Sequence, residues 1–363
     1  MDVTLLKKLV SFDSSAVNED KIGRFLASYL SRLGFKMFRQ PVSQGRFNIL
    51  ASRGSGRHSL MFYGHLDTTA TKTLPGWKSP PLELTPKRDR LYGLGAYDMK
   101  GGIFAFLSAV SEAPAYTKIF LAVDEENISS GAWMAVQKTP SFFTDVSLIV
   151  SAEPNFGYGD NSVTIGRTGR FVFQLVFTGL SAHIARYQAG LDAIDLSARF
   201  VTQFYRRRTT CFSSPHTIAQ VRKISGESIG MSVCDRVTLE VEILPGPLDS
   251  VGNCLTLLRD MSHARVSLKP RSTPYLPGYS FDSFPYQAEI HTTIRKHLGR
   301  PMTLITRSSV GDDNVLATLK IPVITWGPSG DHAHNANEYV SQRSLAVFIA
   351  MYSDLLRAHL LLE

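Results

Sequence analysis

The strongest constraint on this chain is a set of apolar runs that each lead toward a side chain able to bind a metal ion. The runs LMFYG, IFLAV, LIVS and VITW have the length and composition of buried strands in a parallel sheet. Parallel sheets of α/β folds place their ligand sites beyond the carboxyl ends of the strands. Four candidate ligands follow these runs and one precedes a predicted helix: His65, Glu126, Glu153, His334 and Asp98. The sequence therefore predicts an α/β domain with a metal site at one edge of its sheet.

Each of these residues also has an ordinary structural explanation when it is taken alone. Asp98 precedes a predicted helix over residues 99–113, and Asp is a favoured N-cap. Glu126 could be surface charge, and a single His after a strand is more often a buried histidine than a ligand. Five coincidences at one predicted sheet edge explain the pattern less well than a shared metal site does.

The residue types indicate the chemistry of that site. Two imidazoles and three carboxylates suit two divalent, zinc-like ions, with one carboxylate bridging them. Cobalt and manganese accept the same kinds of ligand. Because such ions lower the pKa of bound water to about 7, the set predicts hydrolysis by water that is activated as hydroxide.

The order and spacing of these residues resemble a known family, the dizinc aminoacylases and carboxypeptidases. This family includes acetylornithine deacetylase, succinyl-diaminopimelate desuccinylase and glutamate carboxypeptidase. Its signatures match HLD at 65–67, DEE at 124–126, EP at 153–154 and HNANE at 334–338, and GAYDMKGG at 95–102 matches a further one less one residue. The resemblance extends from about residue 3 to about residue 360. It implies a zinc-exopeptidase-like, three-layer α/β catalytic domain.

The resemblance also implies a role for each ligand. Asp98 would bridge the two ions. His65 and Glu153 would complete the ligands of one ion, and Glu126 and His334 those of the other. The peptide bond between Asp98 and Met99 would be cis.

Three further residues receive roles from the resemblance. Asp67 would accept the free ring N–H of His65 and fix its tautomer. Glu125 would act as general base and then deliver the proton to the leaving amine. His183, in the stretch GLSAH, would reach the active site of the partner subunit and stabilise the oxyanion. From the sequence pattern alone, His183 could also be a surface residue of an edge strand. The family role implies a homodimer with shared sites.

The middle of the chain follows a different pattern. From residue 168 the expected elements have the order β-α-β-β-α-β of ferredoxin-like domains, with helices at 190–206 and 249–261. The resemblance identifies residues 168–272 as an inserted α+β lid and dimerisation domain. Residues 1–167 and 273–363 would then form one discontinuous metal-binding catalytic domain.

Composition narrows the class of protein. The 363 residues are enough for two domains, and the net charge is +8. No basic motif interleaved with aromatic residues accompanies that charge, so we expect no nucleic-acid partner. A basic surface would suit an anionic substrate, or the acidic carrier protein that one branch of the family uses. We find no signal-peptide pattern and no apolar run as long as a membrane span, and three widely spaced cysteines indicate free thiols. We therefore expect a cytoplasmic protein without a membrane partner.

One departure from the family bears on the substrate. Asn314 stands where many relatives have an Arg, which argues against recognition of a succinyl group. Arg170, Arg186 and Arg271 are candidates to bind a substrate carboxylate instead. We predict an N-acyl-amino-acid deacylase of the acetylornithine or acyl-lysine type. The alternatives are a carboxypeptidase or dipeptidase with the same site, a non-catalytic binding relative, and a single-domain zinc aminopeptidase.

Overall fold

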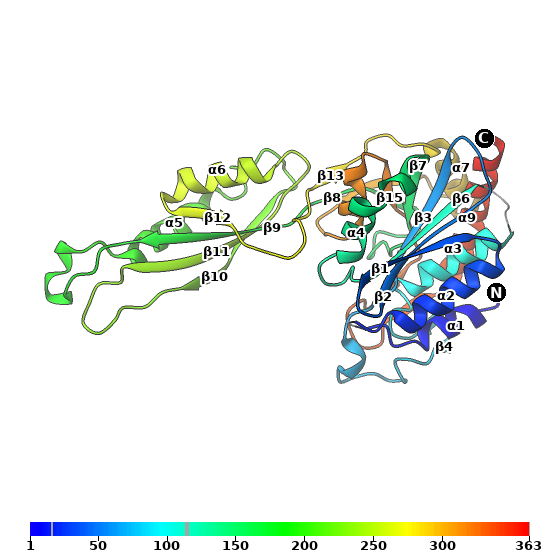
Figure 1. Ribbon diagram of the computed structural model, residues 1–363, viewed down its shortest axis with the longest axis horizontal. Helices are drawn as coiled ribbons and strands as arrows, with labels where there is room; N and C mark the ends of the chain where they lie inside the picture. Colours follow the sequence, from blue (N-terminus) through cyan, green and yellow to red (C-terminus); the bar gives the residue numbers. More distant parts are fainter. Residues whose placement is uncertain (16, 113–115, 363) are drawn as a thin grey trace. The chain divides into compact units, whose positions relative to one another are not determined.

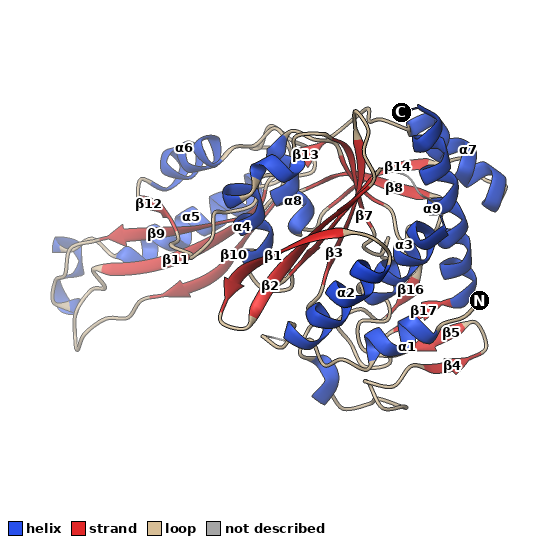
Figure 2. Ribbon diagram, turned by 45° about the vertical axis from the view of Figure 1, so that its right-hand side comes forward, coloured by secondary structure: helices blue, strands red, loops and turns tan. Residues whose placement is uncertain are grey.

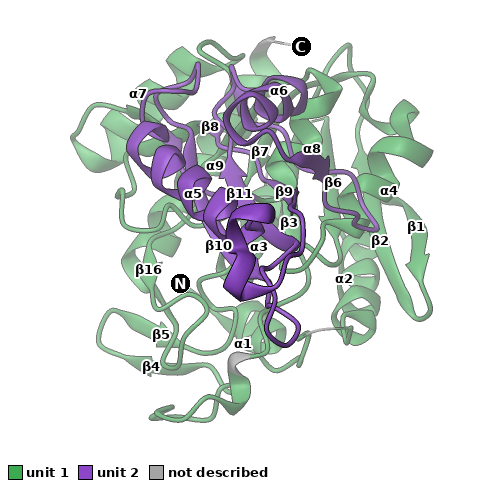
Figure 3. Ribbon diagram, turned by 90° about the vertical axis from the view of Figure 1, so that its left-hand side faces the viewer, with its two compact units in different colours: residues 1–165, 281–305, 311–363 green, residues 166–280, 306–310 purple. Residues whose placement is uncertain are grey.

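A computed structural model describes residues 1–15, 17–112 and 116–362 of the chain. The chain divides into two compact units, which have different colours in Figure 3. Unit 1 consists of Met1–Ile165, Phe281–Ile305 and Gly311–Glu363, and unit 2 of Gly166–Ser280 and Thr306–Val310. Unit 1 is therefore assembled from segments that lie on both sides of unit 2 in the sequence.

Unit 1 is built on a mixed sheet with the strand order β1-β2-β6-β3-β7-β15-β8 (Figure 1). The strands are β1 (Lys36–Ser43), β2 (Arg46–Arg53), β3 (Ser59–His65), β6 (Thr117–Ala122), β7 (Val146–Ser151), β8 (Ser162–Arg167) and β15 (Val323–Thr325). The neighbours β6, β3, β7 and β15 are parallel, as the apolar runs predict. Strands β1, β2 and β8 are antiparallel to their neighbours, and β14 (Thr303–Arg307) also pairs with β8. The carboxyl ends of four neighbouring strands thus meet at one edge.

Side chains that alternate along β3 explain why helices cover both faces of this sheet. The ring of Phe62 lies 5.4 Å from that of Phe106 and 5.1 Å from that of Tyr352, on one face. On the other face, the hydroxyl of Tyr63 donates to Asp312 at 2.6 Å. The helices of the Phe62 face are α1 (Thr4–Val10), α2 (Asp20–Arg32), α3 (Lys100–Glu112), α7 (Gln287–Leu298) and α9 (Gln342–Leu362). Those of the Tyr63 face are α4 (Ser130–Lys138), η2 (Pro140–Phe143) and α8 (Asp312–Leu316), and Figure 2 shows the two sets on either side of β3 and β7. The predicted three-layer α/β architecture is confirmed.

Helix α9 is unusually long and apolar for a helix of this chain. Its stretch Gln342–Leu361 is long and apolar enough to cross a membrane by length and composition alone. Half of this stretch is buried inside the structure, where Leu345, Phe348, Tyr352 and Leu356 pack into the core of unit 1. Their helical spacing places them on one stripe, so packing in the core accounts for the apolar character of the helix.

A second, smaller sheet joins two distant parts of unit 1. Its strand order is β16-β17-β5-β4, with antiparallel pairing throughout. The strands are β4 (Thr85–Lys87), β5 (Arg90–Tyr92), β16 (Gly330–Asp331) and β17 (Tyr339–Ser341). Two single-turn 3₁₀ helices, η1 (Thr71–Thr73) and η4 (Ala317–Leu319), also belong to unit 1. The loop that follows β5 carries Asp98, and the loop that joins β16 to β17 carries His334.

Unit 2 has the predicted β-α-β-β-α-β order. Its elements are β9 (Phe171–Thr178), η3 (Ile184–Ala189), α5 (Ala193–Arg207), β10 (Ile218–Ser225), β11 (Arg236–Leu244), α6 (Val251–Ser262), β12 (Arg265–Leu268) and β13 (Tyr279–Ser280). The antiparallel sheet β10-β11-β9-β12 buries alternate residues of β9, including Phe173 and Leu175, against Phe200 and Phe204 of α5. Asp192 caps α5 through a bond from the Ile194 N–H, which explains where that helix begins.

Candidate metal centre

The structure places the predicted ligands of unit 1 at the ends of neighbouring strands. His65 is the last residue of β3, Glu126 follows β6, and Glu153 follows β7. Asp98 lies just before α3, and His334 lies in the loop between β16 and β17. Because β6, β3 and β7 are parallel neighbours, the first three residues share one edge of the sheet.

Asp98 lies between two imidazole rings. Its Oδ1 is 3.2 Å from Nε2 of His65, and its Oδ2 is 3.2 Å from Nε2 of His334. Nε2 of His334 also lies 3.0 Å from Oε2 of Glu126. The peptide bond from Asp98 to Met99 is cis, as the resemblance implies. The geometry thus joins four of the five predicted ligands through direct contacts.

Close packing at the start of α3 helps to position Asp98. A Cβ atom added to Gly102 would lie 2.0 Å from the carbonyl oxygen of Ala152, just after β7. A Cβ atom on Gly101 would lie 2.4 Å from the carbonyl oxygen of Ala96. Only glycine fits at either place, which gives the two glycines after Lys100 a structural reason.

The arrangement fits a metal ion. His65, Asp98 and Glu126 can each offer one ligand atom, and these atoms all lie within 4.8 Å of one another. Oε1 of Glu126 is buried and has no hydrogen-bond partner among the residues that the structure describes. Because a buried polar atom without a partner is costly, this oxygen is well suited to a cation.

The charges of the site also favour a cation. Hydrogen bonds to Asp98 and Glu126 raise the pKa of His334 to about 10. Burial lowers the pKa of His65, but the hydrogen bond to Asp98 and the charge of Glu125 outweigh it, so that this pKa lies well above its usual value. Burial works to raise the pKa of Asp98, but its hydrogen bonds with the two rings lower it. The pocket therefore stabilises positive charge strongly, as a site for divalent ions must.

Glu125 lies at the same edge and is half-buried, and it is not one of the three described residues whose ligand atoms lie close together. Desolvation raises its pKa well above the usual range of a carboxyl, and the nearby charge of Glu153 adds to the rise. A carboxyl with a raised pKa binds a proton more readily than an ordinary carboxylate does, which favours proton transfer to it from water. Its environment therefore suits a general base.

Asp67 contacts the site differently from what we expected. Nδ1 of His65 lies 2.9 Å from the backbone carbonyl of Asp67 but 3.6 Å from the carboxylate, beyond hydrogen-bond distance. The carboxylate instead accepts the backbone N–H groups of Glu125 at 3.2 Å and of Glu126 at 2.9 Å. The ring of His65 is therefore oriented by main chain, while the Asp67 side chain holds the Glu125–Glu126 backbone.

A buried charge cluster behind Glu125 was not found from the sequence. Nε of Arg46 donates to Glu19 at 2.9 Å, and Nη2 donates to Asp124 at 3.1 Å as well as to Glu19. All three side chains are nearly inaccessible. Asp124 has a positive φ of 71° and directly precedes Glu125. The three charges are far apart in sequence, so no local pattern could have identified the cluster.

The candidate residues of unit 2 have local partners. The exposed His183 uses Nδ1 to accept the N–H of Ala185 at 3.2 Å, which caps η3. Arg170 pairs with Glu242 at 2.7 Å, and the guanidinium of Arg271 lies 5.1 Å from the ring centre of Tyr275. Arg186 is exposed within η3. These contacts do not test the predicted roles of His183 and of the three arginines, which stay predictions.

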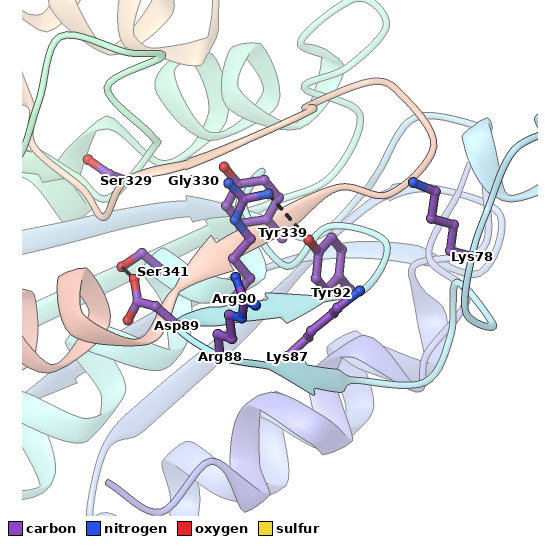
Figure 4. Close-up of a pocket in the computed structure, with 10 residues that line it drawn as sticks. All are labelled: Lys78, Lys87, Arg88, Asp89, Arg90, Tyr92, Ser329, Gly330, Tyr339 and Ser341. Carbon is purple, nitrogen blue, oxygen red and sulfur yellow. Dashed lines mark hydrogen bonds between the residues drawn. The ribbon is translucent and has the colours of Figure 1, made fainter.

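A basic groove of about 760 Å³ lies on the smaller sheet of unit 1 (Figure 4). Its lining includes four cationic side chains, Lys78, Lys87, Arg88 and Arg90, and one acidic side chain, Asp89. The guanidinium of Arg90 stacks 4.4 Å from the centre of the Tyr339 ring. The groove therefore creates a positive potential beside the loop that carries His334.

Comparisons with known proteins agree with this geometry. The model of peptidase family M20/M25/M40 matches residues 61–358. Succinyl-diaminopimelate desuccinylase from Ehrlichia ruminantium is 24% identical, over 98% of this chain and 97% of its own. Acetylornithine deacetylase from Proteus mirabilis is 26% identical, over 93% of this chain and 91% of its own. The solved structure of aminopeptidase PepT from Bacillus cereus superposes with a TM-score of 0.80 at 17% identity, covering 98% of this chain and 97% of that one.

The family match spans most of the chain and includes every residue of the candidate metal site. The solved structure has the same fold. The chain therefore belongs to peptidase family M20/M25/M40 and is a hydrolase.

Proposed function

We propose that this hydrolase cleaves the amide bond of an N-acyl amino acid, of the acetylornithine or acyl-lysine type, with the help of two divalent ions. Zinc is the first candidate, and cobalt or manganese would also suit the ligands. The observation that carries the proposal is Asp98, whose two oxygens each face one imidazole at 3.2 Å. When bound, the ions would polarise the substrate carbonyl and lower the pKa of water to about 7.

Each side chain of the site in unit 1 would then have its own role. The ligands would be His65 and Glu153 for one ion, Glu126 and His334 for the other, and Asp98 shared between them. Glu125 would take a proton from the attacking water and return it to the leaving amine. Asp67 would keep Glu125 and Glu126 in place through their backbone N–H groups.

Two observations support a small acyl group and an anionic substrate. Asn314 is fully buried, its Oδ1 accepts the N–H of Gly311 at 3.0 Å, and its neutral amide lacks the charge with which an Arg binds a carboxylate. The basic groove would attract a substrate carboxylate, or the acidic surface of a carrier protein. A relative that is named acetylornithine deacetylase supports the same class. The alternative is a carboxypeptidase or dipeptidase with the same site, which the family's name as a peptidase family favours.

We also propose that the protein is a cytoplasmic homodimer without a nucleic-acid partner. Its three cysteines are free thiols, which suits a reducing compartment. A second copy would supply His183 to each active site.

The substrate proposal is tested by reconstituting the protein with zinc and assaying N-acetylornithine, N-acetyl-lysine, N-succinyl-diaminopimelate and several dipeptides. We expect cleavage of an acetyl amide and little cleavage of the succinyl amide. Hydrolysis of dipeptides alone would move the protein to the peptidase alternative. Preferred hydrolysis of the succinyl substrate would show that Asn314 does not exclude this group.

The shared position of Asp98 is tested by Asp98→Asn. We expect this variant to lose both ions together, because an amide replaces one of the two ligating oxygens with a donor. Metal content after dialysis would be measured by mass spectrometry. Asp20→Asn, which alters a surface carboxylate paired with Arg24, serves as the control and should retain both ions. Loss of a single ion from the Asp98 variant would contradict a bridging role.

The proposed role of His183 is tested by His183→Ala. Removal of a donor to the oxyanion typically costs about 100- to 1,000-fold in kcat, and metal content should not change. His216→Ala replaces another exposed His of unit 2 and should be close to the unmodified protein. A normal kcat for His183→Ala, or a monomer in solution, would argue against the shared site.

A further inference from the structure

We propose that Glu338 is a positioning residue that fixes the backbone of Asp98 and thereby sets the affinity of the site for its metal ions. The inference rests on the proposed function, because it assumes that Asp98 binds metal. Nothing in the order of the metal-binding residues assigns this role to Glu338, which is not itself a candidate ligand.

The carboxylate of Glu338 holds three backbone N–H groups of one short loop. Oε2 accepts the N–H of Gly95 at 2.7 Å. Oε1 accepts the N–H groups of Tyr97 and Asp98, both at 2.9 Å. Only 2% of Glu338 is exposed. Hydrogen bonds from N–H groups to a buried carboxylate are stronger than those between neutral groups, so the loop has little freedom.

The smaller sheet anchors Glu338 itself. Glu338 precedes β17, whose Tyr339 pairs with Tyr92 of β5, and its carbonyl accepts the N–H of Gly93 at 3.0 Å. The side chain and the main chain of Glu338 therefore hold the segment 93–98 from both ends. The same residue closes the loop that carries His334. Glu338 thus ties the two loops that bring Asp98 and His334 together.

A carboxylate is the group that this position requires. Two oxygens with several lone pairs can accept three N–H groups, whereas a Gln amide has one oxygen and would present an N–H₂ group to one of the donors. The positive charge of Lys100, a buried side chain whose Nζ donates to the carbonyl of Phe12 at 2.9 Å, also interacts favourably with the charge of Glu338. Replacing a residue that holds a metal ligand in place, without binding the metal itself, typically changes metal affinity by about 10- to 100-fold.

Asp249 is a matched control, because its buried carboxylate also accepts backbone N–H groups but is not near a candidate metal ligand in the sequence. Asp249, in unit 2, accepts the N–H of Ser213 at 2.8 Å and of Ser214 at 3.0 Å, and the hydroxyl of Thr217 at 2.5 Å. It is buried to a similar degree as Glu338. Asp249→Asn should therefore lower stability without affecting metal binding.

The test compares Glu338→Gln, Glu338→Ala and Asp249→Asn with the unmodified protein. Zinc affinity would be measured by competition with a chelator, and the Co²⁺ absorption spectrum would report ligand geometry. Hydrogen exchange of the peptide around residues 93–104 would report the loop, and Tm would report stability. We expect Glu338→Gln to bind metal about 10- to 100-fold more weakly, with a changed Co²⁺ spectrum and faster exchange in that peptide. Glu338→Ala should show larger effects, and Asp249→Asn only a lower Tm.

Three results would overturn the inference. Glu338 has a purely structural role if Glu338→Gln lowers Tm, as Asp249→Asn does, but keeps the metal affinity and the Co²⁺ spectrum of the unmodified protein. Unchanged exchange around residues 93–104 would show that the carboxylate does not restrain the loop. If the unmodified protein itself binds no metal, the proposed function fails together with the inference. Because that last result appears in the unmodified protein alone, the two failures are distinguishable.

Discussion

Glu125→Gln should lower kcat by about 100- to 10,000-fold while the metal content stays unchanged. Gln keeps the size of the side chain and its hydrogen-bonding capacity but cannot accept and release a proton. Glu125 is not among the ligand atoms that lie together at the site, so its replacement should leave the ions bound. The desolvation that raises its pKa also explains why a carboxyl at this position can exchange protons with both water and a leaving amine.

The measurement is kcat together with metal content on the same preparation. Glu112→Gln, at the exposed end of α3, is the control and should have normal activity. A loss of metal in parallel with activity would make Glu125 a ligand rather than a base. Activity near that of the unmodified protein would remove it from the mechanism.

Arg46→Met should lower the free energy of unfolding of unit 1 by about 3–5 kcal/mol, which is large compared with the effect of most substitutions. The change removes the cation that faces Glu19 and Asp124 and leaves two buried carboxylates without their partner. The charges of such a cluster are desolvated, so that the loss of one member costs far more than the loss of a surface ion pair. Because Asp124 precedes Glu125, activity should fall as well.

Urea unfolding followed by tryptophan fluorescence would measure this effect. The three tryptophans, Trp77, Trp133 and Trp326, all belong to unit 1, so the signal reports that unit. Arg24→Met breaks a surface pair whose Arg side chain is 69% exposed, and it should change the free energy of unfolding by less than about 1 kcal/mol. Equal effects of the two substitutions would mean that the buried cluster contributes no more than a surface pair.

The parts of this site that could be predicted are those that the sequence specifies locally. A buried strand is recognisable from its own residues, and a parallel sheet brings the ends of such strands together. His65, Glu126 and Glu153 could therefore be assigned to one edge without the structure. The β-α-β-β-α-β order of unit 2 follows from the same kind of pattern, since from Phe173 to Thr178 the buried residues of β9 alternate with more exposed ones.

Contacts between distant segments could not be predicted in this way. Arg46 meets Asp124 because β2 pairs with β6, and it meets Glu19 at the start of α2, so nothing near Arg46 in the sequence indicates the cluster. The bonds from Glu338 to the Asp98 loop likewise depend on the pairing of β17 with β5. The contacts of Asp67 could not be predicted either. Its carboxylate was expected to accept a ring N–H of His65, but it accepts a backbone N–H just after β6.

The central claim is that one chain binds two divalent ions through Asp98 and its neighbours. The most direct test is to strip the protein with a chelator, titrate zinc by calorimetry, and count the bound ions by mass spectrometry. We expect two ions per chain, and amide hydrolysis that returns as the second site fills. A protein that folds normally but binds no zinc, or that binds a single ion and is fully active, would contradict it.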